Sequence, residues 1–318
     1  MMSALSRLWI GGCLLGCLGI AQAEDSAITW LNRMVKASQM LNYEGTFIYL
    51  HDKQLETMSI VHQYDGVMER ERLVSLNGEA REIIKQGDAV TCIWPNSKSV
   101  IVDHGIKKAF PAVLPLDLSV LMSIYRFSLV REERVVERLA QVVRIQPKDL
   151  YRYGYHLWLD KLTALPLKSA RLNHQGEPIE QIMYTSLKVV DHIDRDKLTS
   201  KMMGRAFSWT VNNYNTEADM AKTAWKVVKL PSGFVLSRAT MEQVAHSDEL
   251  VEHLVYSDGL ASISVYIEKQ AGGASLAGAS QMGALTAYGM SKQGYFITVV
   301  GEVPKVTTQL IAESMVKQ

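Results

Sequence analysis

The sequence predicts a mainly β protein of the α+β class with two domains. Apolar and polar residues alternate along most of the first two hundred residues, which is the period of half-buried strands. Turn signals such as Asn77-Gly78 separate these runs, because both central residues of a tight hairpin turn need positive φ. A second, shorter set of strands follows a stretch without a period, and each set is accompanied by one amphipathic helix.

Residues 1–23 are predicted to be a secretory signal peptide that is removed from the mature chain. Arg7 supplies the positive charge, Leu8–Ile20 the apolar segment and Ala21-Gln22-Ala23 the small-x-small cleavage site. The apolar segment is too short for a membrane span, so we expect an exported and soluble chain of 295 residues (318 minus 23). A lipoprotein anchored at Cys17 is the weaker alternative, because the residues before this cysteine fit a lipobox poorly.

The charge and the cysteine content of the chain limit which partners it can bind and whether it can form disulfides. Without residues 1–23 the chain has 33 basic residues (34 minus Arg7) and 33 acidic ones, which is a formal net charge of zero. A nucleic-acid partner requires a basic face, so no nucleic acid is expected. Two of the three cysteines leave with the signal peptide, so no intramolecular disulfide is possible. The third, Cys92, lies in an apolar strand and is expected to pack as a small hydrophobe, with a reactive pair to His51 or His62 as the weaker alternative.

Residues 24–200 form the predicted first domain. From Tyr43 onward roughly nine strands follow one another, and the run Phe110–Tyr125, with Pro111 and Pro115, interrupts them as a short apolar helix or lid. So many strands give a strongly curved sheet whose concave face must be filled or covered. The domain opens with a helix whose apolar side consists of Ile28, Leu31, Met34, Val35, Ser38 and Leu41.

Large apolar side chains of this domain are candidates to line the concave face. Each of them taken singly is more simply a core residue. Together, under a loose apolar lid, they leave a surface that either is plugged or holds a ligand. The predicted lipid-binding residues are Phe47, Tyr49, Trp94, Leu121, Met122, Tyr125, Phe127 and Trp158.

Residues 201–218, which lack any period, are predicted to be a linker, and residues 219–318 a small second domain. Its strands start near Trp225, and one of its hairpins turns at Ser257-Asp258-Gly259. Residues 271–283 are glycine-rich and uncharged, and we expect them to be a flexible stretch. Pro304 suits the first turn of a helix that ends the chain.

Signatures of catalysis are missing from the sequence, which lacks H-E-x-x-H, G-x-S-x-G, a Walker loop and G-x-G-x-x-G. We therefore predict that the protein is not an enzyme and uses no cofactor; a hydrolase has no recognisable nucleophile and base here. Asp191-His192-Ile193-Asp194 places carboxylates beside an imidazole. Neighbouring residues on a strand alternate sides and no second cluster completes a metal site, so a solvated turn is favoured.

Several longer runs along the chain belong together. They are Trp30–Met34, Asn42–Tyr49, Met68–Leu73, Pro147–Asp149, Tyr151–Tyr155, Leu159-Asp160, Leu165–Ser169, Leu230–Phe234, Tyr256–Ala261 and Val299–Pro304. Taken in this order, they resemble the MucB/RseB family of periplasmic sigma-E regulators over essentially the whole mature chain. Such collinear agreement is far more specific than any single motif. One departure is Val136-Glu137-Arg138, a turn in which the family often has glycine.

The resemblance implies a first domain like the lipoprotein carriers LolA and LolB, which is an unclosed antiparallel β-barrel with helices. A smaller β-rich domain with a C-terminal helix follows it. The resemblance also implies a periplasmic negative regulator of the sigma-E envelope stress response. Such a protein binds the periplasmic domain of a membrane-spanning anti-sigma factor of the RseA/MucA type, protects it from proteolysis and releases it on sensing lipopolysaccharide or another acyl-chain ligand. A homo-oligomer is compatible with the sequence.

The resemblance supplies no partner-contacting motif, so the candidates come from surface chemistry. Tyr256, Ser257, Asp258 and Tyr266, around the second-domain turn, are the predicted partner-binding residues, and exposed strand edges are a further place for a peptide to add. That the two tyrosines only pack the hairpin is an equally simple interpretation. A periplasmic lipid or lipoprotein carrier is the alternative function, although such a carrier needs only the first domain.

Overall fold

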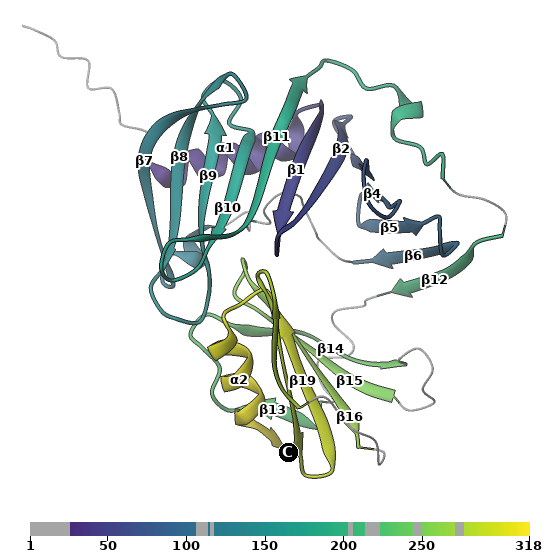
Figure 1. Ribbon diagram of the computed structural model, residues 1–318, viewed down its shortest axis with the longest axis vertical. Coiled ribbons are helices and arrows are strands. Elements are labelled where there is room, and N and C mark those ends of the chain that lie inside the picture. Colours follow the sequence, from purple (N-terminus) through teal and green to yellow (C-terminus); the bar gives the residue numbers. More distant parts are fainter. Residues whose placement is uncertain are drawn as a thin grey trace, which may run out of the picture.

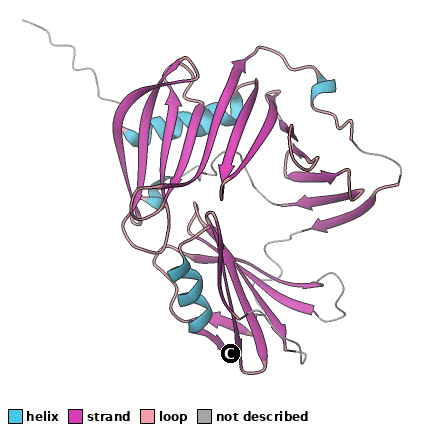
Figure 2. Cartoon of the chain, viewed as in Figure 1, coloured by secondary structure: helices cyan, strands magenta, loops and turns pink. Residues whose placement is uncertain are grey.

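The computed structural model describes residues 26–105, 114, 118–202, 206–213, 223–243, 250–270 and 277–318. Strands dominate, and they form one sheet-based domain above another (Figures 1 and 2). The predicted mainly β fold class is confirmed. The signal peptide with Cys17, and the prolines of the expected lid, lie outside the described residues. None of the helices in the described ranges has the length and apolar character needed to cross a membrane.

Helix α1 (Ala27–Met40) opens the first domain where the periodicity predicts a helix. Ser26 is its N-cap, and the Ser26 hydroxyl accepts a hydrogen bond from the Thr29 amide at 3.1 Å. Leu31 and Met34 are buried as expected. The buried side of the helix is rotated relative to the predicted one. It includes Trp30, which is 5% exposed and which the predicted apolar side did not contain.

A twelve-stranded sheet forms the frame of the first domain. Its spatial order is β12-β6-β5-β4-β3-β2-β1-β11-β10-β9-β8-β7, so the first and last strands do not pair and the sheet is unclosed. Among the described residues before position 200 there are eleven strands, whereas about nine were predicted. The strands are β1 (Tyr43–His51), β2 (Gln54–Tyr64), β3 (Glu69–Ser75), β4 (Glu82–Gln86), β5 (Ala89–Trp94), β6 (Ser99–His104), β7 (Tyr125–Val135), β8 (Arg138–Pro147), β9 (Gly154–Asp160), β10 (Pro166–Leu172), β11 (Pro178–Val189) and β12 (Ser208–Asn213).

Strand β12 corrects the prediction that residues 201–218 are only a linker. It pairs in parallel with β6, whereas every other pairing in this sheet is antiparallel. Trp209 and Val211 alternate with polar residues along it, but the run is short, and both side chains are 55% exposed at the sheet edge, where the pairing is made by the backbone. The prediction therefore overlooked a short alternating run within a segment that otherwise lacks a period.

The main core of the first domain lies between helix α1 and the sheet. Helix α1 packs against β2, β7 and β8, and the 3₁₀ helix η1 (Leu118–Leu121) adds Leu118 and Leu121 to the same cluster. The opposite side of β8, β9 and β10 carries a smaller cluster around Trp158. The short helix η2 (Arg195–Lys197) follows the last long strand, β11.

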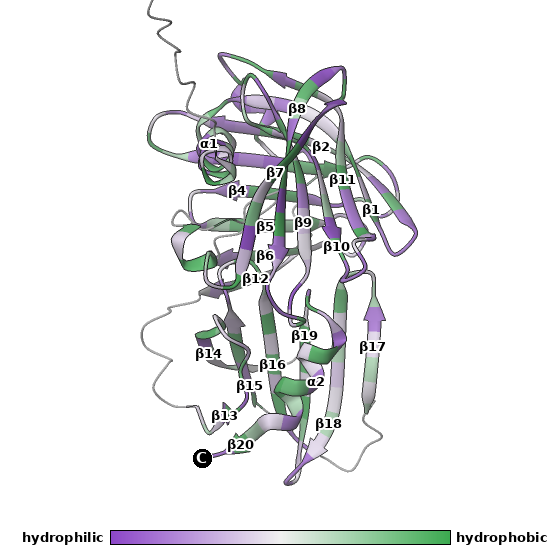
Figure 3. Cartoon of the chain, turned by 90° about the vertical axis from the view of Figure 1, so that its left-hand side faces the viewer, coloured by the Kyte–Doolittle hydropathy of each residue, from purple (hydrophilic) through white to green (hydrophobic). Residues whose placement is uncertain are grey.

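The second domain is a six-stranded antiparallel sheet with the order β14-β15-β16-β19-β18-β17, accompanied by a two-stranded pair and one helix. Pro304 is the N-cap of the predicted C-terminal helix, α2. Strand β17 occupies part of the stretch expected to be flexible, and Figure 3 shows it as the outermost strand of this sheet. The elements are β13 (Trp225–Val227), β14 (Val235–Gln243), β15 (Leu250–Ser257), β16 (Ser262–Lys269), β17 (Gly278–Met282), β18 (Leu285–Lys292), β19 (Tyr295–Gly301), α2 (Lys305–Ser314) and β20 (Met315–Lys317).

Candidate functional site

Five of the eight predicted lipid-binding residues lie together at the main core. Phe47, Leu121 and Tyr125 belong to it and are at most 1% exposed, and Tyr49 and Phe127 pack against it half-buried. The same space is filled by side chains of α1, which include Trp30, Leu31 and Met34. The sheet face under α1 is therefore lined by these residues and packed.

The other three candidates lie elsewhere. Trp158 points to the opposite side of β9 from Leu157 and Leu159, and its indole donates a hydrogen bond to Glu133 Oε2 at 2.7 Å. Met122 is 52% exposed immediately after η1, and Trp94 is half-buried at the end of β5. These residues do not share one surface with the core group.

The predicted partner-binding residues also have separate surroundings. Tyr256 is buried in the core of the second domain. Tyr266 is half-buried, and its ring stacks on His253 at 4.2 Å between centroids. The Ser257 hydroxyl donates to Ala261 O at 3.0 Å within the turn, and Asp258 is buried against the first domain.

Asp258 forms the centre of an interdomain contact with Arg152. The Arg152 guanidinium is fully buried, and Nη1 donates to Asp258 Oδ2 at 2.7 Å. Nη2 donates to the Ser232 carbonyl at 2.6 Å, and Nε donates to Asp149 Oδ1 at 3.1 Å. One arginine of the first domain thus bonds to two groups of the second domain while Asp149 orients it. Such charge-assisted hydrogen bonds are stronger than neutral ones.

Two aromatic rings enclose this ion pair. The guanidinium carbon lies 5.6 Å from the ring centroid of Tyr125 and 5.0 Å from that of Phe234. The Tyr125 hydroxyl donates to Asp258 Oδ2 at 3.2 Å, and burial together with the Asp258 charge raises the pKa of Tyr125. We refer to Arg152, Asp258, Tyr125, Ser232 and Phe234 as the interdomain clasp.

A second group of contacts joins the domains beside the clasp. Arg171 forms ion pairs with Glu180 at 2.9 Å and with Glu302 of the second domain at 2.7 Å. The Tyr49 hydroxyl donates to Glu180, and burial and this hydrogen bond raise the pKa of Tyr49. On α2 the Thr307 hydroxyl donates to the Tyr151 carbonyl at 2.8 Å. The two domains therefore meet through directed polar contacts.

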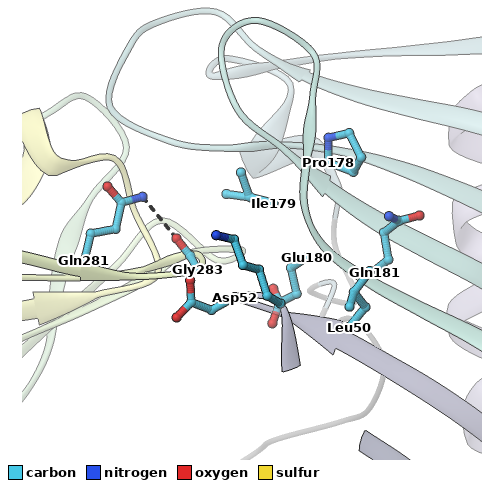
Figure 4. Close-up of a pocket in the computed structure, with 9 residues that line it drawn as sticks. Leu50, Asp52, Pro178, Ile179, Glu180, Gln181, Gln281 and Gly283 are labelled. Carbon is cyan, nitrogen blue, oxygen red and sulfur yellow. Dashed lines mark hydrogen bonds between the residues drawn. The ribbon is translucent and has the colours of Figure 1, made fainter. Parts of the chain in front are cut away.

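A cleft of about 650 Å³ lies where the β1–β2 and β17–β18 hairpins approach each other. Figure 4 shows Gln281 and Gly283 of the second domain on one side and Leu50, Glu180 and Gln181 of the first on the other. The cleft offers amide, carboxylate and backbone groups beside the apolar side chains of Leu50, Pro178 and Ile179. Its lining consists of Leu50, Asp52, Lys53, Pro178, Ile179, Glu180, Gln181, Gln281 and Gly283.

Strand β17 reaches the cleft as an unprotected sheet edge. All five of its residues are exposed and none is charged. Edge strand β7 of the first sheet, in contrast, carries five charged residues among its eleven. Edge strand β12 is also uncharged, but none of its residues lines the cleft. Charges on an edge discourage pairing with another chain, whereas an uncharged exposed edge accepts an added strand. The cleft and β17 together can bind an extended peptide.

The sequence alone did not identify Arg152, Glu180 or Gln281 as functional residues. A buried arginine beside an acidic residue three positions earlier is a weak local signal for an ion pair. Its second partner, Asp258, lies 106 residues away in the sequence, and no local pattern reveals such a contact.

Comparison with known proteins decides the family. The model of the MucB/RseB N-terminal domain matches residues 26–202, and the model of the MucB/RseB C-terminal domain matches residues 219–316. The chain belongs to the MucB/RseB family. The family resemblance seen in the sequence is thereby confirmed.

Relatives match over nearly their full length. The sigma factor AlgU regulatory protein MucB of Pseudomonas aeruginosa is 34% identical over 325 residues, which cover 99% of this chain and 98% of MucB. The sigma-E factor regulatory protein RseB of Escherichia coli K12 is 27% identical over 300 residues, which cover 93% and 92%. The complex structure of Pseudomonas aeruginosa MucA/MucB contains a chain that matches with a TM-score of 0.74 at 30% identity, covering 92% of this chain and 99% of that one. A crystal structure of MucB matches with a TM-score of 0.65 at 30% identity, covering 92% and 98%.

Proposed function

We propose that this MucB/RseB-family protein is a periplasmic negative regulator that binds the periplasmic segment of a membrane-spanning anti-sigma factor. Two findings support this function. Its relatives are named as regulators of AlgU or of sigma-E, and MucB has been solved in complex with MucA. Binding that shields the anti-sigma factor from proteolysis would keep the sigma factor inactive. The protein acts by binding and not by turnover in this proposal.

The observation that carries the binding site is the exposed, uncharged edge of β17 beside the interdomain cleft. An extended segment of the partner would add to β17 through backbone hydrogen bonds, and its side chains would contact the cleft. Because both domains line the cleft, the bound segment would contact both at once. Affinity would then depend on how the clasp places one domain against the other.

Substitution of Ser280 tests this site. Ser280→Lys places a charge in the middle of β17, where an added strand would bury it, whereas the exposed serine has no described partner to lose. We expect at least a tenfold weaker affinity for the purified periplasmic segment of the anti-sigma factor, measured by isothermal titration. Thr210→Lys on the exposed edge strand β12 is the matched control and should stay within twofold of wild type. Equal affinity of both variants and wild type would exclude β17 as the binding edge.

For lipid sensing we propose that an acyl chain enters beside η1. Val120 and Met122 are exposed there by 56% and 52%, while Leu121 between them is fully buried in the main core. Tyr125 follows within four residues and bonds to Asp258, so a chain that displaces Leu121 would disturb the clasp. Each buried methylene contributes about 0.8 kcal/mol, so a few methylenes suffice to offset one clasp hydrogen bond.

Lipopolysaccharide titration tests this step. We expect lipopolysaccharide to weaken binding of the anti-sigma segment to wild type, and Met122→Glu to remove that effect without changing affinity in its absence. Leu162→Glu, at a residue that is 86% exposed in the β9–β10 turn, is the control. Affinity that does not respond to lipopolysaccharide in wild type would exclude the switch. Lipid binding without any effect on the partner would favour the lipid carrier.

A further inference from the structure

A histidine and two glutamates converge between β2 and β3, at the end of α1 and away from the interdomain cleft. His62 on β2 lies directly opposite Glu71 on β3, and Glu69 lies two positions from Glu71 on the same side of that strand. His62 is fully buried and Glu71 is 5% exposed. One imidazole nitrogen and one carboxylate oxygen from each glutamate all lie within 4.8 Å of one another.

The hydrogen bonds of His62 fix which of its nitrogens faces the glutamates. Nδ1 lies 2.8 Å from the Leu41 carbonyl, which only accepts, so Nδ1 carries the proton. In the neutral imidazole Nε2 then holds a lone pair, and it points at Glu69 Oε1 at 3.2 Å. A lone pair opposite a carboxylate needs a positive charge between them, which is either a proton or a metal ion.

The two glutamates differ in their own partners. Glu69 Oε2 accepts a hydrogen bond from Lys85 Nζ at 2.8 Å, so Oε1 is the atom left for His62. The side chain of Glu71 has no hydrogen bond or ion pair to any other described residue, although it is almost completely buried. A nearly buried carboxyl without a described side-chain partner, opposite a histidine, calls for a compensating group.

We propose that His62, Glu69 and Glu71 bind one divalent transition-metal ion, with zinc preferred. In a tetrahedral zinc site with bonds of about 2.0–2.1 Å, neighbouring ligand atoms lie roughly 3.3 Å apart. The 3.2 Å between His62 Nε2 and Glu69 Oε1 already fits this spacing. Glu71 completes the site by a small side-chain rotation, and a water takes the fourth position. The imidazole favours zinc over magnesium or calcium, which prefer oxygen ligands alone.

The surroundings resemble the outer shell of a built metal site. Metal-binding histidines usually donate their other ring N–H to a carbonyl, and His62 does so to Leu41. Lys85 orients Glu69, and the ring of Tyr43 stacks on His62 at 4.7 Å between centroids. The Glu69 side chain is 22% exposed, which gives an ion a route of entry. A bound ion would tie the end of α1 to β2 and β3, a role beyond the proposed function.

Zinc titration of the full mature chain tests the proposal. After treatment with EDTA, wild type should bind one zinc ion per chain by isothermal titration, while magnesium gives no heat, and zinc should raise the melting temperature. Glu71→Gln keeps the shape of the side chain and removes its charge, so it should weaken zinc binding at least tenfold. His192→Gln is the control, because His192 and Asp194 are both more than three-quarters exposed and 3.9 Å apart.

Glu71→Gln leaves every hydrogen bond of His62 in place, so we expect the variant to fold. Circular dichroism checks this separately. A folded Glu71→Gln variant that binds zinc as tightly as wild type would overturn the proposal. Wild type that binds no zinc would also overturn it and would leave the three residues as a proton-sharing cluster. Loss of binding in His192→Gln alone would place the ion at that exposed turn and equally exclude the buried site.

Discussion

Replacement of Asp258 by asparagine should remove the ion pair of the clasp and keep the hydrogen bonds of the turn that contains Asp258. Asp258 Oδ1 accepts hydrogen bonds from the amides of Leu260 and Ala261 at 2.8 and 2.6 Å, and an asparagine oxygen can keep both. Oδ2, which accepts from Arg152 and Tyr125, becomes an amide that presents its own N–H groups to the guanidinium. Asp258→Asn therefore leaves a fully buried cation without its main partner.

The expected cost follows from burial on both sides of the pair. Removing one partner of a buried ion pair costs about 3–5 kcal/mol, and Arg152 keeps Asp149 and the Ser232 carbonyl, so we expect the lower end, about 3 kcal/mol. Urea unfolding followed by tryptophan fluorescence measures this loss. Arg152→Met and the double variant complete a cycle whose coupling energy should exceed about 1.5 kcal/mol.

An exposed pair provides the matched control for this cycle. Arg134 and Glu137 are 3.8 Å apart with side chains 73% and 90% exposed, so Arg134→Met should change the free energy of unfolding by less than about 0.5 kcal/mol. If the effects of Asp258→Asn and Arg152→Met add to within about 0.5 kcal/mol, the two side chains are not coupled and the clasp is refuted.

Four further substitutions test the fold. Leu121→Ala leaves a cavity in the main core and should cost about 2–5 kcal/mol in urea unfolding. Gly45→Ala places a Cβ 2.5 Å from a carbonyl oxygen of β11 and should destabilise the protein, so a melting temperature equal to wild type would contradict the close approach of the strands. Glu137 has φ of 60° and Glu137→Gly should raise the free energy of unfolding by about 1 kcal/mol. Burial lowers the pKa of His156, whose Nε2 accepts a hydrogen bond from Arg144. The unfolded chain therefore binds more protons than the folded one, and stability falls as the pH drops below about 6.5. His156→Gln should flatten that decline when the melting temperature is measured against pH.

Local patterns predicted the elements better than their contacts. The alternation along Tyr43–His51 and the helical spacing around Leu31 each depend on neighbours within a few residues, and both elements were found. Strand β12 was missed because the alternation of Trp209 and Val211 with polar neighbours is short and lies in a segment otherwise without a period. Alternation also does not say whether the face it creates is filled, and Phe47 and Leu121 lie in a packed core.

At the candidate site, too, contacts between neighbours in the sequence were predictable and contacts between distant residues were not. The Asp258-Gly259 pair predicts a turn, and the Asp258 carboxylate does accept the turn amides. That its second oxygen binds Arg152 depends on how two domains meet, which no spacing in the sequence encodes. The predicted roles of Tyr256 and Tyr266 in partner binding stay predictions, since Tyr256 packs in the core and Tyr266 stacks on His253.

The two edges of the large sheet are unlike in one more respect. Tyr125 of the clasp begins β7 at one edge, while the chain departs for the second domain from β12 at the other. Opening the clasp, together with the Arg171–Glu302 and Thr307–Tyr151 contacts beside it, would leave the two domains joined through the chain that follows β12. Domains so joined meet again at an effective concentration on the order of millimolar. A brief separation of the domains would therefore reverse without help. Only a molecule that stays bound between the two domains would keep them apart.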